Sequence, residues 1–355
     1  MKIARYLRNF AKRAAKTIKA SRTRSANSGF TLTEILVSMI IAGIIMSGLM
    51  TVMVELLTSD ARETARTETQ QEMQMALDYI SADIREAAYV YDGECLAGNV
   101  RVQNPSGGTI DVCGDGLFNR INVPDNTVPV LAFWKLEPIP DSVLRDDCNF
   151  SEQLPPGIPC VAARSYSLVI YYLTRNNSEE GSVGPWAGMG RIRRAVYRQF
   201  PGGELNQDYI NPMDVGFDAW PGGGGAPELP TPITLVDFVD DRDMQIIADV
   251  QQVQGMEVDC PENYNLTPSD QTLNRYDFGG VRNFYACVLD ETGRQARAFE
   301  AGQDDPTAFN QKVILFIRGN AAGKPGIRSA NEGFMPAIQT QVLNRSVRRK
   351  SPRGF

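Results

Sequence analysis

The chain has 355 residues, 43% of them hydrophobic and 22% charged, and its 31 glycines and 21 prolines predict many turns and irregular loops. It contains no histidine, which is the commonest general base and the commonest metal ligand. Hydrolase and zinc chemistry are therefore disfavoured, and an ordinary Ser-His-Asp triad is excluded. No P-loop or dinucleotide fingerprint is present. The sequence predicts a protein that is not an enzyme and that needs no cofactor.

The charged residues are distributed unevenly along the chain. Residues 1–29 carry nine basic side chains and no acidic one, whereas the whole chain has a net charge of −6, so the remainder is strongly acidic. An acidic body argues against nucleic acid as a partner, because nucleic-acid binding requires a basic footprint. A basic N-terminus ahead of an apolar segment is held in the cytoplasm by the positive-inside rule. We therefore expect a single-pass protein of the inner membrane with a periplasmic head.

The apolar segment is Ile35–Leu57. At about 1.5 Å per residue, a helix of this length crosses a hydrocarbon core of about 30 Å. A cleaved secretory signal is the alternative, but its small-residue cleavage site would follow the apolar region. Here the small residues Ser28 and Gly29 precede that region. We expect residues 1–29 to be a cleaved basic leader and residues 30–57 to be a helix that stays in the lipid bilayer.

The residues at this junction, Gly29-Phe30-Thr31-Leu32-Thr33-Glu34, resemble the type IV prepilin signature. The resemblance implies that a prepilin peptidase cuts after Gly29 and N-methylates Phe30. It also implies that Glu34 pairs with the N-terminal amine of a neighbouring subunit. The implied partners are other pilins or pseudopilins and the inner-membrane assembly platform. A carboxylate on an apolar helix is costly to desolvate, which favours such a partner; the alternative for Glu34 is contact with lipid headgroups.

Residues 58–92 are polar and contain no glycine or proline, and their apolar residues recur at three-to-four spacing. This pattern predicts one helix from Thr31 to about Tyr91, ended near Gly93, whose second half packs an apolar stripe on a globular head. A coiled coil is the alternative. The stripe is rich in alanine and broken around Thr67–Glu72, so a heptad seam is not sustained.

Residues 93–344 contain short β-type segments separated by loops rich in glycine and proline. The candidate strands are Val130–Leu136, Ser165–Leu173, Arg191–Gln199, Ile233–Val239, Asn283–Leu289 and Lys312–Arg318. The first three are expected to form an antiparallel meander on the helix. The alternation of the third is imperfect, so we expect one face of it in solvent. The predicted fold class is α+β, with a long N-terminal helix packed on an antiparallel β-sheet head, and it resembles the PilW-like minor pilins and pseudopilins.

Six cysteines follow the apolar segment, and none has C-x-x-C spacing. They are Cys95, Cys113, Cys148, Cys160, Cys260 and Cys287. Six cysteines allow fifteen pairings, but their order suggests three local loops, each linking neighbours along the chain. Each loop would stabilise the head by about 3 kcal/mol in the chain-entropy model. An oxidising compartment favours these disulfides over the alternative of reduced, buried thiols.

Two clusters of side chains are candidate binding residues. Carboxylates follow the predicted strand near residue 239, and carboxylates at this density can bind Ca²⁺. Their spacing does not match an EF-hand loop, and a solvated acidic turn is the alternative. An aromatic set could stack on sugars, but its place on predicted strands favours core packing. The two clusters are Asp237, Asp240, Asp241 and Asp243, and Phe133, Trp134, Tyr166, Tyr171 and Tyr172.

Two segments have the composition of loops or tails. The loop 201–232 is long, and loops of this length are commonly functional or flexible. The tail, residues 345–355, is basic, and we expect it to be disordered and solvated. Contact between this tail and acidic polysaccharide or lipid headgroups is the alternative.

The stretch from Met73 to Leu96 resembles the cyanobacterial hormogonium polysaccharide secretion pseudopilins, the C-type member in particular. The resemblance implies a structural subunit of a type IV pilus-like machine that supports polysaccharide secretion and gliding motility. A bulky head hinders dense helical packing, which favours a low-copy minor subunit. The alternative is an adhesin or binding module at a filament tip, which would contact a surface, polysaccharide or DNA.

Overall fold

The computed structural model describes residues 30–98, 101–103, 109–111, 115–140, 142–143, 164–176, 186–213, 227, 229–243, 260–289, 311–327 and 335–344. The chain divides into two compact units, Met1–Thr58 and Ser59–Phe355. Helix α2, Leu32–Arg85, contributes to both.

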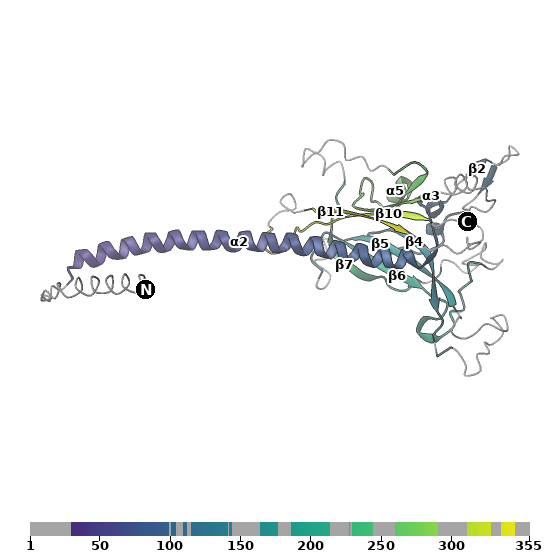
Figure 1. Ribbon diagram of the computed structural model, residues 1–355, viewed down its shortest axis with the longest axis horizontal. Coiled ribbons are helices and arrows are strands. Elements are labelled where there is room, and N and C mark those ends of the chain that lie inside the picture. Colours follow the sequence, from purple (N-terminus) through teal and green to yellow (C-terminus); the bar gives the residue numbers. More distant parts are fainter. Residues whose placement is uncertain are drawn as a thin grey trace, which may run out of the picture. The chain divides into compact units, whose positions relative to one another are not determined.

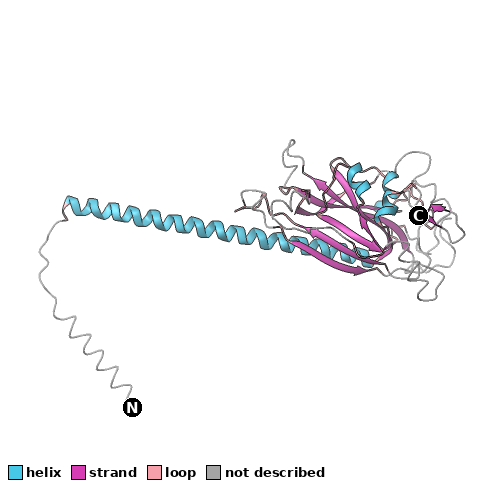
Figure 2. Ribbon diagram, turned by 90° about the horizontal axis from the view of Figure 1, so that it is seen from above, coloured by secondary structure: helices cyan, strands magenta, loops and turns pink. Residues whose placement is uncertain are grey.

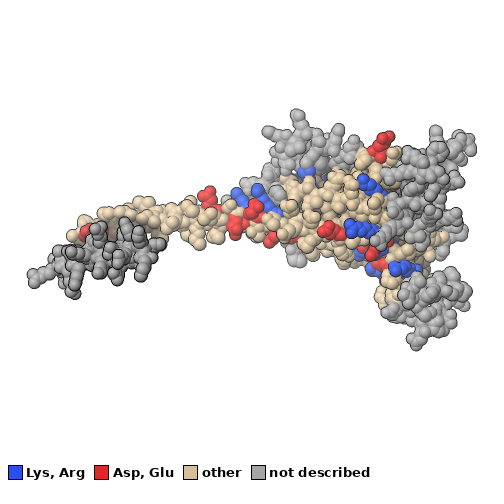
Figure 3. Space-filling view, viewed as in Figure 1, with Lys and Arg blue, Asp and Glu red and all other residues tan. Residues whose placement is uncertain are grey.

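In the first unit, the described residues are the start of α2. Isoleucine, leucine and methionine dominate this part of the helix, and no proline interrupts it. Every residue from 30 to 57 is exposed, and in Figure 3 this stretch is almost entirely tan. By length and composition alone, the helix is able to cross a membrane.

The second unit contains two antiparallel sheets and a two-stranded ribbon. The larger sheet has the order β1-β4-β5-β6-β7, and its strands are β1 (Ala87–Val90), β4 (Thr127–Pro138), β5 (Arg164–Arg175), β6 (Gly190–Tyr197) and β7 (Ile233–Val239). The smaller sheet has the order β11-β10-β9-β8, and its strands are β8 (Tyr264–Thr267), β9 (Phe284–Leu289), β10 (Lys312–Arg318) and β11 (Ala337–Leu343). The ribbon pairs β2 (Arg101–Gln103) with β3 (Thr109–Asp111). The short helices are α3 (Gly93–Ala97), α5 (Asp270–Arg275), η1 (Leu117–Asn119) and η3 (Pro201–Gly203).

This arrangement confirms the predicted α+β class. The six predicted strands correspond to β4, β5, β6, β7, β9 and β10 and differ from them only at their ends. The part of α2 in the second unit runs alongside the larger sheet, and the smaller sheet lies beside it (Figures 1 and 2).

One hydrophobic core joins the second half of α2 to both sheets. Because the stripe on α2 repeats every three to four residues, it presents one face to the strands. The buried apolar residues of this stripe are Met73, Ala76, Leu77, Ile80 and Ile84. They share a cluster with Phe133 and Val169 of the larger sheet and with Val288 and Leu315 of the smaller one. The stripe is therefore used within the head rather than in a coiled-coil seam.

The opposite face of the larger sheet carries a second core, which contradicts the expected solvated face. Side chains alternate along each strand, so Phe133 and Tyr171 enter the first core while Trp134 and Tyr172 enter the second. The segment around η1 and the loop after η3 supply the covering residues. These are Leu117, Phe118 and Ile121, with partly buried Tyr209, Ile210, Met213 and Leu229. The described part of the loop 201–232 is thus packed on the sheet.

The helix is shorter than the sequence suggested. It ends at Arg85, and the next residues form β1, paired with β4. The helix propensity of alanine is a weak preference that tertiary packing can override. Ala87 and Ala88 are therefore found in a strand although alanine favours a helix. Val90 lies in the first core and Tyr89 in the second. Neighbouring side chains that point to opposite faces have the period of a strand. Both can be buried here because there is one core on each side of the sheet.

Asp83, in the last turn of α2, binds three strands at once. Its Oδ1 accepts from Lys135 Nζ of β4 at 2.9 Å. Its Oδ2 accepts from Tyr171 Oη of β5 at 2.7 Å and from Arg194 Nε of β6 at 2.8 Å. Tyr171 and Arg194 are direct neighbours across β5 and β6. Lys135 also contacts Glu86 at 2.8 Å, so the end of the helix is fixed to the sheet by charge.

The ionisation of Asp83 depends on these contacts. Burial alone would raise the pKa of Asp83, but hydrogen bonds from Lys135 and Tyr171 and the positive charges of Arg194 and Lys135 hold the pKa below its usual value. Burial and the neighbouring Asp83 carboxylate raise the pKa of Tyr171, so this hydroxyl remains a donor. The network therefore consists of ionised Asp83 with protonated partners at neutral pH.

The free edge of β1 is closed by a side chain. The N–H of Val90 donates to Gln311 Oε1, and Gln311 Nε2 donates to the carbonyl of Val90, both at 2.9 Å. Asn344, directly after β11, orients Gln311: its Oδ1 accepts from Gln311 N at 2.7 Å, and its Nδ2 donates to Gln311 Oε1 at 3.2 Å. The amide of Gln311 thus takes the place of a peptide group of a neighbouring strand.

We expect Asp83→Asn to destabilise the head by about 3–5 kcal/mol, because it leaves the buried Arg194 without its counter-charge. The matched control is Glu68→Gln on the same helix, where the side chain is 56% exposed and 3.6 Å from Lys324. This control should change the stability by less than about 1 kcal/mol. Urea unfolding of the full chain in detergent measures both, and equal effects would contradict the role of Asp83.

The difference in stability between wild type and Asp83→Asn should depend on pH. The pKa of Asp83 in the folded protein lies below that in the unfolded chain, whose usual value is about 3.9. The contribution of Asp83 is therefore complete above that value and is lost as the pH falls through the folded pKa. Unfolding free energies of both proteins, measured from neutral pH to about pH 2, should converge at the acid end. A constant difference would show that the charge of Asp83 is not responsible.

Candidate functional site

The candidate processing and assembly site lies at the start of α2. Gly29, after which cleavage is predicted, lies outside the described residues. Phe30 is 81% exposed, so a large aromatic side chain at this position has no cover within the described chain. The helix begins two residues later at Leu32, and Thr31 is the residue that precedes it.

Thr31 and Glu34 form a reciprocal pair of caps. The N–H of Glu34 donates to Thr31 Oγ1 at 3.4 Å, and the N–H of Thr31 donates to Glu34 Oε2 at 3.2 Å. The hydroxyl of Thr31 also donates to Glu34 Oε2 at 3.1 Å. This is the capping-box arrangement, which a threonine followed three residues later by a glutamate can form. The sequence around the predicted cleavage site therefore also starts the helix.

The carboxylate of Glu34 can accept a further hydrogen bond beside those of the cap. Within the described residues no donor contacts its Oε1, and Glu34 is the only charged side chain between residues 30 and 54. A negative group in the first turn is favoured by the helix dipole. In this arrangement Glu34 Oε2 caps the helix while Oε1 can accept from an incoming cation.

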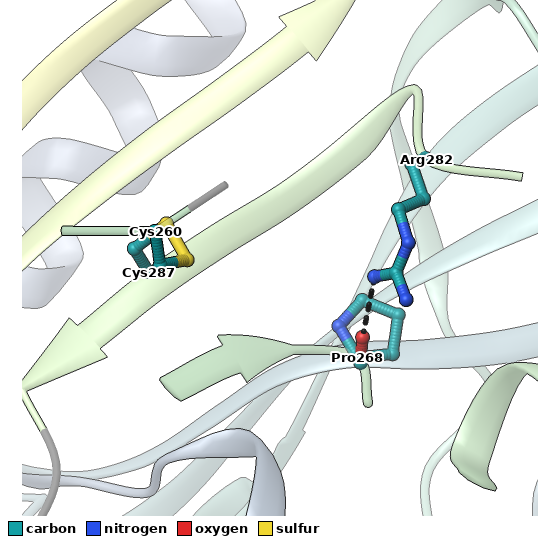
Figure 4. Close-up of a disulfide and its surroundings, with 4 residues drawn as sticks. All are labelled: Cys260, Pro268, Arg282 and Cys287. Carbon is teal, nitrogen blue, oxygen red and sulfur yellow. Dashed lines mark hydrogen bonds between the residues drawn. A yellow bond between two sulfur atoms is a disulfide. The ribbon is translucent and has the colours of Figure 1, made fainter. Parts of the chain in front are cut away.

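The described cysteines are disulfide-bonded. Cys260 and Cys287 are linked, with Cα atoms 5.6 Å apart, so the expected loop between them is present (Figure 4). The bond joins the segment that enters β8 to the middle of β9. Nearby, Arg282 donates to the carbonyl of Pro268 at 3.1 Å. Cys95 is also bonded, whereas Cys113, Cys148 and Cys160 lie outside the described residues, and the other two pairings remain predictions.

The acidic cluster at the end of β7 is not a solvated turn, because its carboxylates accept hydrogen bonds from the protein or are at least partly buried. Asp237 is buried and accepts from the N–H groups of Ala187 and Gly188 at 2.9 and 3.0 Å. Asp240 is fully buried and accepts from Arg242 at 2.9 and 3.1 Å and from Asn320 at 3.1 Å.

The other two carboxylates of the cluster are also not arranged around a common centre. Asp241 lies 3.7 Å from Arg175, and Asp243 is close to Gly280. No group of three potential metal ligands occurs among the described residues. Protein donors occupy Asp237 Oδ2 and both oxygens of Asp240, whereas Asp237 Oδ1 and Asp241 Oδ1 are buried without a hydrogen bond among the described residues.

The five aromatic residues considered for sugar stacking are all buried. Phe133, Trp134, Tyr171 and Tyr172 are fully buried, and Tyr166 is 7% exposed. Trp134 Nε1 donates to Tyr91 Oη at 2.8 Å inside the second core. A ring can stack on a sugar only from an exposed face, so these residues serve packing.

Two cavities that share Arg85 as a lining residue were not predicted from the sequence. The first, of about 820 Å³, is lined by Ala82, Arg85, Glu86, Lys135, Leu136, Glu137, Pro138, Arg164 and Arg198. Lys135 and Arg198 are paired there with acidic side chains. The second, of about 560 Å³, is lined by Arg85, Lys312, Gln341, Val342 and Leu343. Figure 3 shows several basic side chains on one face of the head. The cations come from distant segments, so no local motif could have indicated them.

Comparison with known proteins supports the reading of the N-terminal site. A family model described as the prokaryotic N-terminal methylation motif matches residues 24–50, which include Phe30 and Glu34. No curated protein and no solved structure matches the chain. The motif, the apolar helix and the antiparallel sheets support a prepilin-type protein with a type IV pilin-like fold, and they fit a membrane-anchored subunit.

Proposed function

We propose that this chain is a minor pilin or pseudopilin, a low-copy structural subunit of a type IV pilus-like assembly. In this proposal a prepilin peptidase removes residues 1–29 after Gly29 and N-methylates Phe30. The N-terminus faces the cytoplasm and the head faces the periplasm. Other pilins and the inner-membrane assembly platform are the partners, and Glu34 sets the position of the subunit among them.

The observation that carries the proposal is the exposed apolar surface of α2. All residues from 30 to 57 are exposed, and their large side chains include Phe30, Ile40, Ile44, Met50 and Leu56 at 55–81% exposure. A continuous apolar surface of this size is not left in water by soluble proteins. Lipid can cover it before assembly and neighbouring helices can cover it afterwards, and Glu34 is the polar group that such neighbours must satisfy.

The proposed process is polysaccharide secretion with gliding motility. It is supported by the resemblance of the Met73–Leu96 stretch to cyanobacterial hormogonium polysaccharide secretion pseudopilins. A low copy number is supported by the size of the second unit, which extends from Ser59 to Phe355. A head that contains two sheets and long connecting loops limits how densely copies can pack around a common axis.

A binding module at a filament tip is the second candidate. The observation in its favour is the larger cavity, where the exposed side chains of Arg85 and Arg164 have no ion-pair partner in the described chain. Titration of the full chain with a polyuronate and with single-stranded DNA tests this candidate. Binding that is lost in Arg164→Glu would support it, and no binding would leave the structural role.

Mass spectrometry of the protein extracted from membranes tests the processing step. The mature chain should begin at Phe30, and its N-terminal fragment should be heavier than the sequence mass by one CH2, because N-methylation replaces a hydrogen with a methyl group. A Gly29→Leu variant is the control and should retain the leader. An intact leader in the wild-type protein, or cleavage beyond Leu57, would refute the proposal.

Two substitutions at Glu34 separate the charge from the cap. Glutamine can still cap the helix, whereas alanine removes a contribution of about 1 kcal/mol to the helix start. Because pairing with an amine requires the charge, we expect both Glu34→Gln and Glu34→Ala to remain in the membrane and to enter filaments several-fold less than wild type.

The control for the Glu34 experiment is Glu55→Gln on the same helix, which should enter filaments normally. The measurement is the amount of the protein in sheared filaments relative to the membrane fraction. Normal incorporation of Glu34→Gln together with loss in Glu34→Ala would assign Glu34 to capping alone.

A further inference from the structure

One edge of the smaller sheet is open. β11 pairs with β10 over its whole length, from Lys312 opposite Leu343 to Arg318 opposite Ala337, and it is the terminal strand of the sheet. In an antiparallel sheet, alternate residues direct their N–H and C=O groups away from the neighbouring strand. Residues 337–343 make no further hydrogen bond in the part of the chain that the structure describes. The outward backbone groups of β11 are therefore available.

The other three edges of the two sheets are each covered at least in part. Gln311 closes β1. Gly319 bridges to Val239 at the edge of β7, and the N–H of Asn320 donates to the carbonyl of Phe238 at 2.7 Å. α3 lies against β8 so closely that a Cβ on Gly93 would collide with the carbonyl of Leu266. Proteins cover sheet edges in these ways to prevent unwanted pairing, and β11 is the edge strand with no such contact in the part of the chain that the structure describes.

The composition of β11 does not protect it either. Open edges are commonly defended by lysine, proline or an inward charge. The strand Ala337–Leu343 has none of these, and its outward side chains are Ala337, Gln339, Gln341 and Leu343, all exposed. Leu343 alone is 59% exposed. An uncharged strand with a free backbone is a template for another strand.

A positively charged cavity lies at the end of this edge. It has a volume of about 560 Å³, and Arg85 and Lys312 line it together with Gln341, Val342 and Leu343. No acidic residue is among the lining residues, and neither cation has an ion-pair partner within the described chain. The positive charge of the cavity is therefore complementary to a carboxylate. The strand beside it can form backbone hydrogen bonds with another extended polypeptide.

We propose that β11 and this cavity dock an extended acidic segment of a partner protein by β-strand addition. Only a polypeptide repeats N–H and C=O groups at the spacing that β11 presents, which favours a protein over a polysaccharide or a lipid. Arg85 and Lys312 select a carboxylate side chain at one end of the added strand. The proposal concerns the head alone and stands whether or not the chain enters a filament.

The test uses the full chain in detergent and a synthetic peptide of about ten residues, a length that spans a strand such as β11. Threonine and valine alternate in the peptide between a glutamate at each end. One control peptide has lysine in place of glutamate, and a second carries N-methyl groups on alternate backbone amides. The glutamate peptide should bind, should protect the amides of β11 from hydrogen exchange, and should bind less tightly as salt is added. Both control peptides should fail to bind.

Three variants locate the bound peptide. Arg85→Glu and Lys312→Glu should each lower the affinity at least about threefold, because each reverses a charge in the cavity. Arg164→Glu is the matched control, since Arg164 is also exposed and without an ion-pair partner but lies only in the neighbouring cavity. This control should bind as wild type does. Circular dichroism of each variant verifies that the fold is retained.

Several results would overturn the proposal. Equal binding of the N-methylated peptide, or unprotected β11 amides, would exclude strand addition. A polyuronate that binds as tightly as the peptide would make the surface a polysaccharide site. An equal loss in Arg164→Glu would place the peptide in the larger cavity. A concentration-dependent dimer of the chain that protects β11 without peptide would make a second copy the occupant.

Discussion

The head is organised around one buried carboxylate. Asp83 is 5% exposed and binds Lys135, Tyr171 and Arg194, which lie on three consecutive strands of one sheet. A buried ion that loses its partners costs several kcal/mol, and a shift of the helix by one turn, about 5.4 Å, would separate all of them. Asp83 therefore sets the position of α2 on the sheet, and with it the point where the helix ends and β1 begins.

Much of this fold could be predicted from the sequence, because its main elements have strong local patterns. The unbroken apolar run, the alanine-rich stripe and strands such as β7 and β10 carry their own periodicity. β8 and β11 were not predicted, since β8 has four residues and β11 alternates around glutamine and threonine. The end of α2 and the covered face of β6 depend on a second core that is built from residues distant in sequence, Phe118 and Tyr209 among them.

In the candidate site, too, the residues of a local motif could be predicted, whereas roles that depend on distant partners could not. The sequence predicts Phe30 and Glu34 because the chemistry of their motif is local, and the helix cap between Thr31 and Glu34 follows from the same residues. The roles of Asp237 and Asp240 could not be predicted from the sequence, because most of their donors lie far away in the chain. The donors come from residues 187, 188 and 320, and only residue 242 is local. The cations at Arg85, on α2, and Lys312, on β10, are far apart in the chain and line one cavity only in the folded head.

The side-chain amide of Gln311 has a mechanical consequence. It holds β1, which directly follows the end of α2, and it is itself held by Asn344, which directly follows β11. A load on the end of β11 therefore has a path through two amides to the junction of helix and sheet, in addition to the path through the hydrophobic core that contains Val342. Hydrogen bonds of this kind transmit position because they are directional. The two sheets are thus linked by two side-chain amides, so a displacement of β11 acts on β1 through hydrogen bonds of defined direction.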